Sequence, residues 1–237
     1  MNPYALAVYK CPFTKIRLGK DNDGGYVIAN LPNAKYTLLL SGGIESEITF
    51  EETFIDKYPN ATCLAFDGTI DKLPEGNTPK NSRITFIKKN IGSENSEKIT
   101  NLHHIINAND AIFIKMDIEG SEIPWIKSLN DTQMNKFEQI VIEFHNPFLD
   151  SDAEAFDKLN RTHYLIHFHG NNCCGLNFHK GVNIPFVFEC TYLHKKFFTE
   201  VPELNTDLIP SSLDMKNIDA DEIHIDYPPF VNALFCA

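Results

Sequence analysis

Two carboxylates follow an apolar run near the middle of the chain and are its first candidates for chemistry. Residues 111–116 are apolar apart from one lysine, and Asp117 and Glu119 come directly after them. A short apolar run with β-branched residues is typical of a buried parallel strand, and ligands bind at the carboxyl edge of a sheet of such strands. Carboxylates there could serve acid–base chemistry or cation binding. The alternative is a core strand followed by a solvated acidic turn.

Histidines and a further glutamate end the next two apolar runs. Glu143 and His145 close the run that begins at residue 139, and His169 closes the run after it, two residues behind another histidine. Histidine has an ordinary pKa of about 6.5 and can accept a proton from a hydroxyl group. Carboxylates and histidines together are also candidate ligands of a divalent metal. A structural role for the histidines is the remaining alternative. The candidate metal ligands are Asp117, Glu143, His145 and His169.

Glycines and polar residues end three earlier apolar runs. Gly42-Gly43-Ile44 comes shortly after the first run, Asp67-Gly68 follows the second, and Asn90-Ile91 follows the third. Glycines let a backbone approach a ligand closely, and an acid about 24 residues after such a loop binds ribose hydroxyls in nucleotide-binding α/β domains. The runs therefore predict a nucleoside-shaped site. The chain has neither a Walker sequence nor G-x-G-x-x-G, which disfavours nucleoside triphosphates and dinucleotides.

The elements that must position these residues alternate between strand and helix. The apolar spacing predicts five β-α steps and then a β-β finish without a helix between the last two strands. Such a pattern predicts a seven-stranded, mostly parallel sheet with helices on both faces and an antiparallel β-hairpin at one edge. The predicted strands are 36–40, 61–66, 83–88, 110–117, 139–147, a strand that begins at 164, and 185–193, and the predicted helices are 46–58, 96–107, 123–129 and 152–161.

We expect three segments along the chain. Residues 1–35 contain the turn signal Asp23-Gly24 and are predicted to form an N-terminal hairpin or lid. Residues 36–199 are predicted to form the nucleoside-binding domain. Residues 200–237 are rich in proline and acids and are expected to pack on its surface as a tail.

Composition narrows the class of partner. The formal net charge is −11 over 237 residues, which argues against nucleic acid or an anionic membrane as the main partner. No apolar run reaches the roughly 18 residues that cross a membrane. The six cysteines are scattered without a C-x-x-C pair, and Cys63 and Cys190 lie in strand-like runs, so we expect buried thiols rather than a zinc site. We expect a cytoplasmic protein, either a monomer or a homodimer.

At this point the motifs resemble a known family. Residues 113–122, Phe-Ile-Lys-Met-Asp-Ile-Glu-Gly-Ser-Glu, are similar to the K-(I/M)-D-(I/V)-E-G-x-E signature of the FkbM-type S-adenosylmethionine-dependent methyltransferases. Residues 17–27 resemble a lead-in found in one branch of that family, and residues 40–50 resemble its first cofactor loop. The resemblance covers roughly residues 15–195. One departure is the first loop, Ser-Gly-Gly-Ile, in place of a fuller G-x-G-x-G.

The resemblance implies a class I methyltransferase fold, a Rossmann-like three-layer sandwich, with S-adenosylmethionine as methyl donor. By position, Gly42 and Gly43 would approach the methionine moiety, and Asp67 would bind the ribose. Asn90 and Ile91 would border the adenine, and Asp117 would lie near the methionine amine or a metal. The candidate cofactor-binding residues are Gly42, Gly43, Ile44, Asp67, Gly68, Asn90, Ile91, Asp117 and Glu119.

The resulting hypothesis is an S-adenosylmethionine-dependent O-methyltransferase that acts on a hydroxyl group of a small-molecule or saccharide-linked acceptor. His145 or His169 is the expected base, and Glu143 is the third catalytic candidate. One rival is a divalent-metal enzyme, either metal-assisted methyl transfer or a hydrolase, and another is a nucleoside-binding module without catalysis. The candidate substrate-binding residues are Arg17, Tyr26, Asn171 and Asn172.

Overall fold

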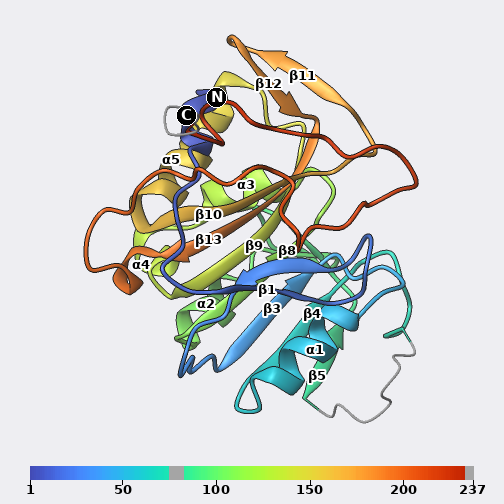
Figure 1. The fold of residues 1–237 in the computed structure, drawn as a ribbon. Coiled ribbons are helices and arrows are strands. Elements are labelled where there is room, and N and C mark those ends of the chain that lie inside the picture. Colours follow the sequence, from blue (N-terminus) through green and yellow to red (C-terminus); the bar gives the residue numbers. More distant parts are fainter. Residues whose placement is uncertain (75–82, 233–237) are drawn as a thin grey trace.

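A twisted sheet forms the centre of the molecule. The computed structural model describes residues 1–74 and 83–232, and within them seven strands pair in the order β10-β13-β9-β8-β3-β4-β5 (Figure 1). The strands from β9 to β5 in this order are parallel, and β13 is antiparallel to both of its neighbours. The predicted fold class, with its antiparallel pair at one edge, is confirmed. The strands are β3 (Leu38–Gly42), β4 (Thr62–Phe66), β5 (Ile84–Ile87), β8 (Ile112–Met116), β9 (Phe137–His145), β10 (His163–Gly170) and β13 (Val187–His194).

The central strands are apolar on both faces because both faces are covered. Leu38 and Leu40 of β3 belong to one hydrophobic core, and Leu39 between them belongs to the other. The same alternation holds in β8, where Phe113 and Ile114 face opposite cores. Burial on both faces explains why these strands read as continuous apolar runs in the sequence.

One face is covered by a helix and a hairpin. Helix α1 (Thr49–Lys57) lies beside the antiparallel pair β1 (Lys15–Leu18) and β2 (Tyr26–Ala29), which crosses the front of the sheet (Figure 1). The Gln139 side chain of β9 bonds both backbone groups of Ala29, at 2.6 and 3.3 Å. The hairpin is therefore fixed to the sheet face. The proposed division of the chain at residues 35 and 199 stays a prediction.

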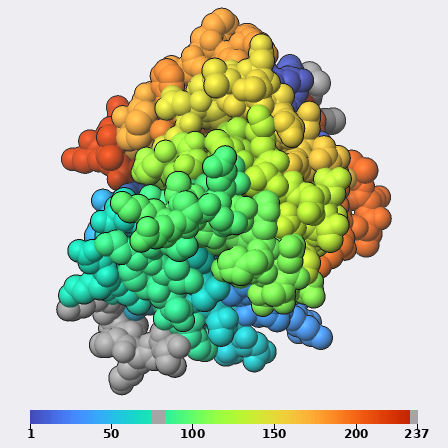
Figure 2. Space-filling model, turned by 180° about the vertical axis from the view of Figure 1, so that it is seen from behind, coloured from blue at the N-terminus to red at the C-terminus, as the bar shows by residue number. Residues whose placement is uncertain are grey.

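Helices alone cover much of the other face. They are formed by residues near 100–165, which appear green to yellow when the molecule is seen from behind (Figure 2). Trp125, Ile126 and Leu129 are buried there, as their spacing predicts. The helices are α2 (His103–Ala108), α3 (Glu122–Ser128), α4 (Asp131–Met134) and α5 (Ala153–Thr162), and the short 3-10 turns of the chain are η1 (Pro3–Leu6), η2 (Asp150–Asp152) and η3 (Lys195–Phe197).

Two predicted segments differ in the structure. The helix expected over residues 96–107 begins only at His103, because the Ser96 side chain accepts from the Ile99 backbone N–H and turns the chain before it. Residues 99–100 instead form β7 (Ile99–Thr100), which pairs in parallel with β6 (Asn90–Ile91). In addition, β11 (Leu176–His179) and β12 (Val182–Pro185) form a projecting hairpin where a loop was expected (Figure 1).

The tail runs back over the domain without regular elements in residues 200–232. Ile209, Ile225 and Phe230 are buried in the core that contains α3 and α5. Asp214 accepts a hydrogen bond of 2.7 Å from Nε2 of His167 on β10. The tail is thus integrated into the folded core as far as residue 232, and the rest of the predicted tail lies outside the described residues. No helix within the described ranges has the length and apolar character needed to cross a membrane.

Candidate active site

The loop that follows β3 and the loop that follows β8 contact each other at the carboxyl edge of the sheet. The backbone N–H of Asp117 donates to the Gly42 carbonyl at 3.1 Å. A Cβ on Gly43 would lie 1.6 Å from the Asp117 carbonyl oxygen, and Gly43 has φ +71°. A Cβ on Gly42 would lie 2.6 Å from the Ile91 side chain. Only glycine fits at position 43, where backbone occupies the space, whereas a side chain at position 42 would have to displace the side chains of Ile91 and Met116.

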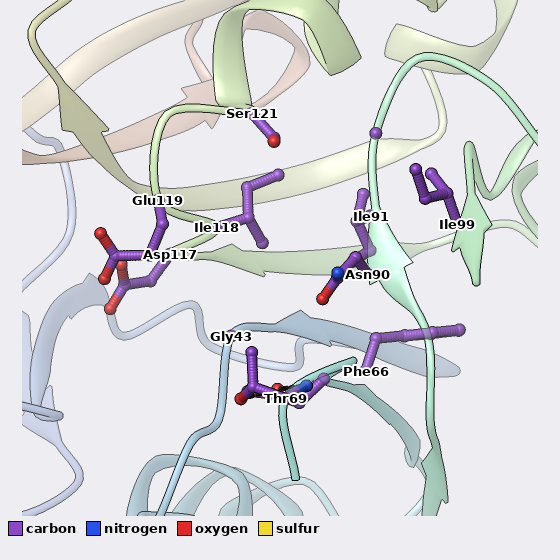
Figure 3. A pocket seen from close by; sticks show the side chains of 12 residues that line it. Gly43, Phe66, Thr69, Asn90, Ile91, Ile99, Asp117, Ile118, Glu119 and Ser121 are labelled. Atoms are coloured by element: carbon purple, nitrogen blue, oxygen red, sulfur yellow. Dashed lines mark hydrogen bonds between the residues drawn. The ribbon is translucent and has the colours of Figure 1, made fainter.

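A cavity of about 360 Å³ opens beside this contact, and we name it the first cavity (Figure 3). Its apolar walls include Phe66, Ile91 and Ile99, and Asp67 and Asn90 add hydrogen-bonding groups. Six of the nine predicted cofactor residues line it, whereas Gly42, Ile44 and Gly68 do not. The six are Gly43, Asp67, Asn90, Ile91, Asp117 and Glu119.

Asp67 ties the first loop to the end of β4. One carboxylate oxygen accepts from the backbone N–H groups of Ile44 (3.2 Å) and Glu45 (2.8 Å), and the other accepts from the Thr69 N–H and hydroxyl (2.7 and 2.6 Å). Burial raises the pKa of Asp67, but the bonds from Thr69, Glu45 and Ile44 outweigh burial and lower it. A ribose bound here would have to share these oxygens with the backbone.

Asn90 has a similar role at the start of β6. Its side-chain oxygen accepts from the backbone N–H of Gly68 at 2.9 Å, and a Cβ on Gly68 would lie 2.3 Å from that oxygen. Asn90 and Gly68 therefore fix the wall of the first cavity between β4 and β6.

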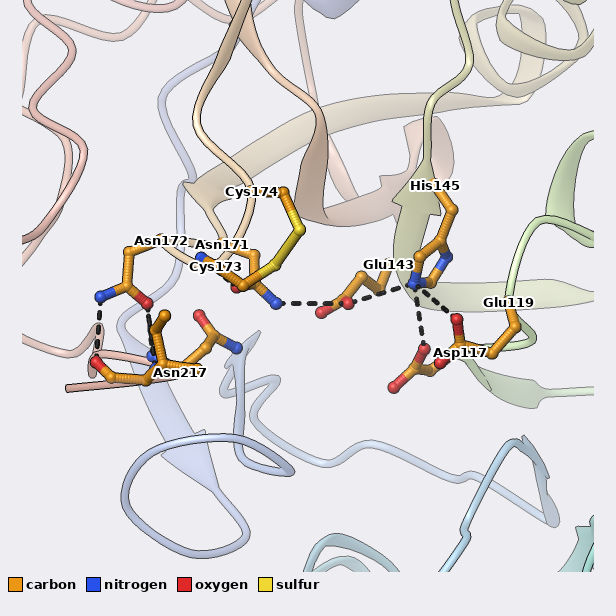
Figure 4. The surroundings of a disulfide bond; sticks show 10 residues. Asp117, Glu119, Glu143, His145, Asn171, Asn172, Cys173, Cys174 and Asn217 are labelled. Atoms are coloured by element: carbon orange, nitrogen blue, oxygen red, sulfur yellow. Dashed lines mark hydrogen bonds and ion pairs between the residues drawn. A yellow bond between two sulfur atoms is a disulfide. The ribbon is translucent and has the colours of Figure 1, made fainter. Parts of the chain in front are cut away.

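Four carboxylates surround the side chain of His145 next to the first cavity, and we name these five residues the His145 cluster. They are His145, Asp117, Glu119, Glu122 and Glu143. Nδ1 of His145 lies 3.0 Å from Oε1 of Glu122. Its Nε2 lies 3.4 Å from Glu143, 3.5 Å from Glu119 and 3.8 Å from Asp117 (Figure 4). The prediction that Asp117, Glu143 and His145 meet at one edge is therefore correct.

The cluster strongly changes the acidity of its members. Burial disfavours the charged form of His145, but hydrogen bonds and charges from Glu122 and Glu143 outweigh burial and raise its pKa to about 10. Burial is also the main cause that raises the pKa of Glu143 to about 8. The pKa of Asp117 is raised as well, again chiefly by burial. The cluster is thus a place where negative charge is costly and a positively charged partner is favoured.

Glu122 is a site residue that sequence reasoning missed. Its buried Oε1 accepts from the backbone N–H groups of Ile118 and Gly120, each at 3.1 Å, in addition to its contact with His145. It therefore folds the loop between β8 and α3 and sets the orientation of the imidazole. The available signal is its place as the last residue of the motif, which by itself indicates only a favourable first-turn position.

Lys115 and Tyr26 support the site from the hairpin side. The buried Lys115 ammonium donates to the Gly42 carbonyl at 3.4 Å and also to the Gly43 carbonyl. The Tyr26 hydroxyl donates to Oδ2 of Asp117 at 3.1 Å. Tyr26, predicted to bind substrate, thus holds the Asp117 carboxylate in place. Like Glu122, Lys115 is a site residue that the sequence analysis did not identify.

A second cavity of about 460 Å³ lies next to the first. The two share Gly43, Asp67, Thr69, Asp117 and Glu119. Five residues line the second cavity but not the first: Glu143, His145 and Asn171, and Asn217 and Ile218 of the tail. Asn171 donates to Glu143 at 3.4 Å, so this predicted substrate residue reaches the site (Figure 4).

Besides Gly42, Ile44, Gly68 and Tyr26, three more predicted site residues line neither the first nor the second cavity. His169 is not among the described residues that line either cavity, because β13 separates its strand from β9, and it lies 3.5 Å from Glu189. Asn172 bonds the tail backbone four times. Arg17 donates to carbonyls of its own hairpin loop. The contacts of these three residues therefore stabilise the fold and do not form the site.

The cysteines also differ somewhat from expectation. Cys63 and Cys190 are buried thiols, as predicted. Cys173 and Cys174, for which the sequence analysis made no separate prediction, form a disulfide that lines the second cavity (Figure 4). Adjacent cysteines carry no spacing signal, so the sequence offered no reason to pair them. Cys236 lies outside the described residues.

Comparison with protein-family models assigns the chain to a family. A model described as the methyltransferase FkbM domain matches residues 6–171, which is more than half of the chain. The curated proteins contain no match.

Solved structures are only distantly similar. The fibrillarin pre-rRNA processing protein of Methanococcus jannaschii gives a TM-score of 0.38 at 9% identity over 69% of each chain. The precorrin-6y C5,15-methyltransferase of Geobacter metallireducens gives 0.36 at 11% identity over 66% of this chain and 79% of that one. CalO1, a methyltransferase in calicheamicin biosynthesis solved in its SAH-bound form, gives 0.33 at 7% identity over 70% and 50%. These scores are too low to support an assignment, which comes from the family match. The chain belongs to the FkbM methyltransferase family and is an S-adenosylmethionine-dependent methyltransferase.

Proposed function

We propose that this enzyme transfers a methyl group from S-adenosylmethionine to a hydroxyl group of a small-molecule or saccharide-linked acceptor. The observation that carries the proposal is the pair of adjoining cavities. They share a wall at Gly43, Asp117 and Glu119, so that ligands in the two cavities meet at the carboxyl edge of the sheet. Two ligands held in adjoining cavities are what a group transfer requires, because most of its acceleration comes from alignment.

The first cavity suits the donor. Its volume of about 360 Å³ falls within the usual range of roughly 300–1,000 Å³ for small-molecule sites. Phe66, Ile91 and Ile99 offer apolar walls to the adenine. Asp67 and Asn90 offer hydrogen bonds to the ribose and the base, and the methionine moiety would lie toward Gly43. The residues present therefore fit S-adenosylmethionine.

The second cavity then holds the acceptor. When bound, S-adenosylmethionine supplies an electrophilic methyl group on a sulfonium and keeps the electron pair of the broken carbon–sulfur bond. Glu143 and His145, which contact each other at 3.4 Å, line the second cavity near the shared wall. They are placed to orient the acceptor hydroxyl, and Glu143 in its ionised form can receive the hydroxyl proton as the new carbon–oxygen bond forms. His169 lines neither cavity and the pKa of His145 is raised to about 10, so this proposal places proton removal at Glu143.

Calorimetric titration in EDTA tests the donor site. We expect micromolar binding of S-adenosylmethionine and of its demethylated product, and none of NAD. Ile99→Asp should weaken that binding at least tenfold, because it places a charge on an apolar wall of the first cavity. Ile218→Asp is the matched control, since Ile218 is also partly exposed but lines only the second cavity.

Two results would contradict the proposal. If the wild-type protein binds neither S-adenosylmethionine nor its demethylated product, the first cavity is not a donor site. Equal loss of binding in the two isoleucine variants would show that the nucleoside does not occupy the first cavity. With binding established, turnover on free sugars and on other hydroxyl compounds would identify the acceptor.

A further inference from the structure

Three buried oxygen atoms on the wall of the second cavity lack a hydrogen-bond donor among the described residues. They are Oδ1 of Asp117, Oε2 of Glu143 and Oδ1 of Asn217. The Asn217 amide is oriented by its own nitrogen, which donates to Glu189 at 3.2 Å. A buried polar atom without a partner destabilises the fold, and more so when it is charged. With both carboxyl groups ionised, all three atoms are acceptors, so the missing partner is a donor or a cation.

The arrangement of the ligating atoms favours a cation. One atom each from Asp117, Glu143 and His145 all lie within 4.8 Å of one another. The contacts of His145 Nε2 with Glu143 and Asp117 are 3.4 and 3.8 Å. Ligand atoms held about 2.1 Å from one octahedral ion are about 3.0 to 4.2 Å apart. The spacing therefore suits a single ion with little rearrangement.

The orientation of the imidazole points to the same conclusion. Oε1 of Glu122 lies 3.0 Å from Nδ1 of His145, and it is itself held by two backbone N–H groups. Metal-binding histidines almost always donate the N–H of their other ring nitrogen to a carboxylate, a backbone carbonyl or water, which fixes the tautomer and the orientation of the ring. Here Nε2 of His145 faces Asp117, Glu119 and Glu143 (Figure 4).

We propose that Asp117, Glu143 and His145, with Glu119 at the open side, bind one divalent cation of the Mg²⁺ or Mn²⁺ class. Several carboxylate oxygens select hard cations, and a single imidazole is compatible with Mn²⁺. Asp117 and Glu119 belong to the wall shared by the two cavities, so the cation lies where the acceptor hydroxyl approaches. This role rests on the proposed function: the charge of the cation favours the ionised form of that hydroxyl, and the proton passes to the Glu143 carboxylate oxygen that does not bind the cation.

Manganese titration monitored by electron paramagnetic resonance tests the site without any assay of activity. Protein stripped with EDTA and freed of the chelator is titrated with MnCl₂, and the signal of free Mn²⁺ reports binding. We expect one Mn²⁺ per chain. Glu143→Gln should weaken binding at least tenfold, and Glu119→Gln should weaken it several-fold. Glu119 is 85% exposed, so its variant tests the site with little risk to folding.

Glu222→Gln is the matched control. Glu222 is also a carboxylate beside a buried histidine, 3.4 Å from Nε2 of His169, but it lies outside the His145 cluster. Its variant should bind Mn²⁺ like the wild type. Failure of the wild type to bind Mn²⁺, or equal binding by all variants, would overturn the proposal. The nucleoside titration in EDTA separates the two ideas, because donor binding without Mn²⁺ binding leaves the methyltransferase site intact and removes only the cation.

Discussion

Replacing Glu122 with alanine should loosen the loop that joins β8 to α3. The Glu122 carboxylate is 1% exposed, and one of its oxygens accepts from Ile118 N–H and Gly120 N–H and contacts Nδ1 of His145. Alanine removes all three contacts. The loop should then lose its shape, and Ile118 lines the first cavity, so donor binding should weaken together with stability.

The magnitude follows from the three contacts. A hydrogen bond to a charged group contributes about 1.5–3 kcal/mol to stability. Gly120 is exposed and Ile118 is only half-buried, so water can replace some of what these two N–H groups lose. We therefore expect Glu122→Ala to lower the free energy of unfolding by about 3 kcal/mol, a large share of the roughly 5–15 kcal/mol typical of a domain. Glu122→Gln keeps an oxygen for the two N–H groups and should cost about 1 kcal/mol.

Urea denaturation in EDTA measures this series against a control. Glu154→Ala removes a carboxylate that is 61% exposed and lies 3.8 Å from Lys127, so it should change stability by no more than about 0.5 kcal/mol. The expected order of stability is wild type and Glu154→Ala, then Glu122→Gln, then Glu122→Ala. If Glu122→Ala stays within about 0.5 kcal/mol of wild type, other contacts hold the loop and the role given to Glu122 is wrong.

Two further changes test the first loop and the tail. Gly43→Ala should abolish donor binding and unfold the protein at a much lower temperature, because its Cβ meets a backbone oxygen at 1.6 Å. Gly120→Ala, at φ +90° but in open space, should cost only about 1–2 kcal/mol in the same melting experiment. Burial raises the pKa of Asp214, but the charge and hydrogen bond of His167 outweigh it and hold that pKa well below its usual range. Asp214→Asn should therefore lower the free energy of unfolding by about 2 kcal/mol at pH 7. A carboxylate whose pKa is lowered in the folded state stabilises that state only while it is ionised. Urea titrations should therefore show the difference between wild type and variant shrinking as the pH falls from about 4 toward the folded-state pKa.

The sheet and one half of the site could be predicted because each depends on local pattern. Strands buried on both faces are apolar throughout, as Phe113 and Ile114 show, so the runs and their ends are visible in the sequence. Parallel strands bring their carboxyl ends to one edge, which is why Asp117, Glu143 and His145 could be expected to meet.

The remaining residues depend on neighbours that no local pattern reveals. The spacing of the His169 strand indicates which face the side chain occupies, but not that β13 lies between it and His145. Asn172 bonds a backbone N–H 45 residues further along the chain, at Asn217. Glu122 escapes sequence reasoning because a glutamate in a first turn usually faces solvent, whereas this one folds back on its own loop.

The N-terminal hairpin has a consequence for how the chain is made. It leaves the ribosome before the residues that hold it, because Ala29 is held by Gln139, and Val27 accepts a hydrogen bond from Thr191. At synthesis rates of about 5–20 residues per second, the apolar face of the hairpin waits roughly 10 to 30 seconds for its partners. The hairpin is therefore synthesised well before the residues that hold it and docks only after them, so apolar side chains such as Tyr26 and Ile28 stay exposed to aggregation during translation.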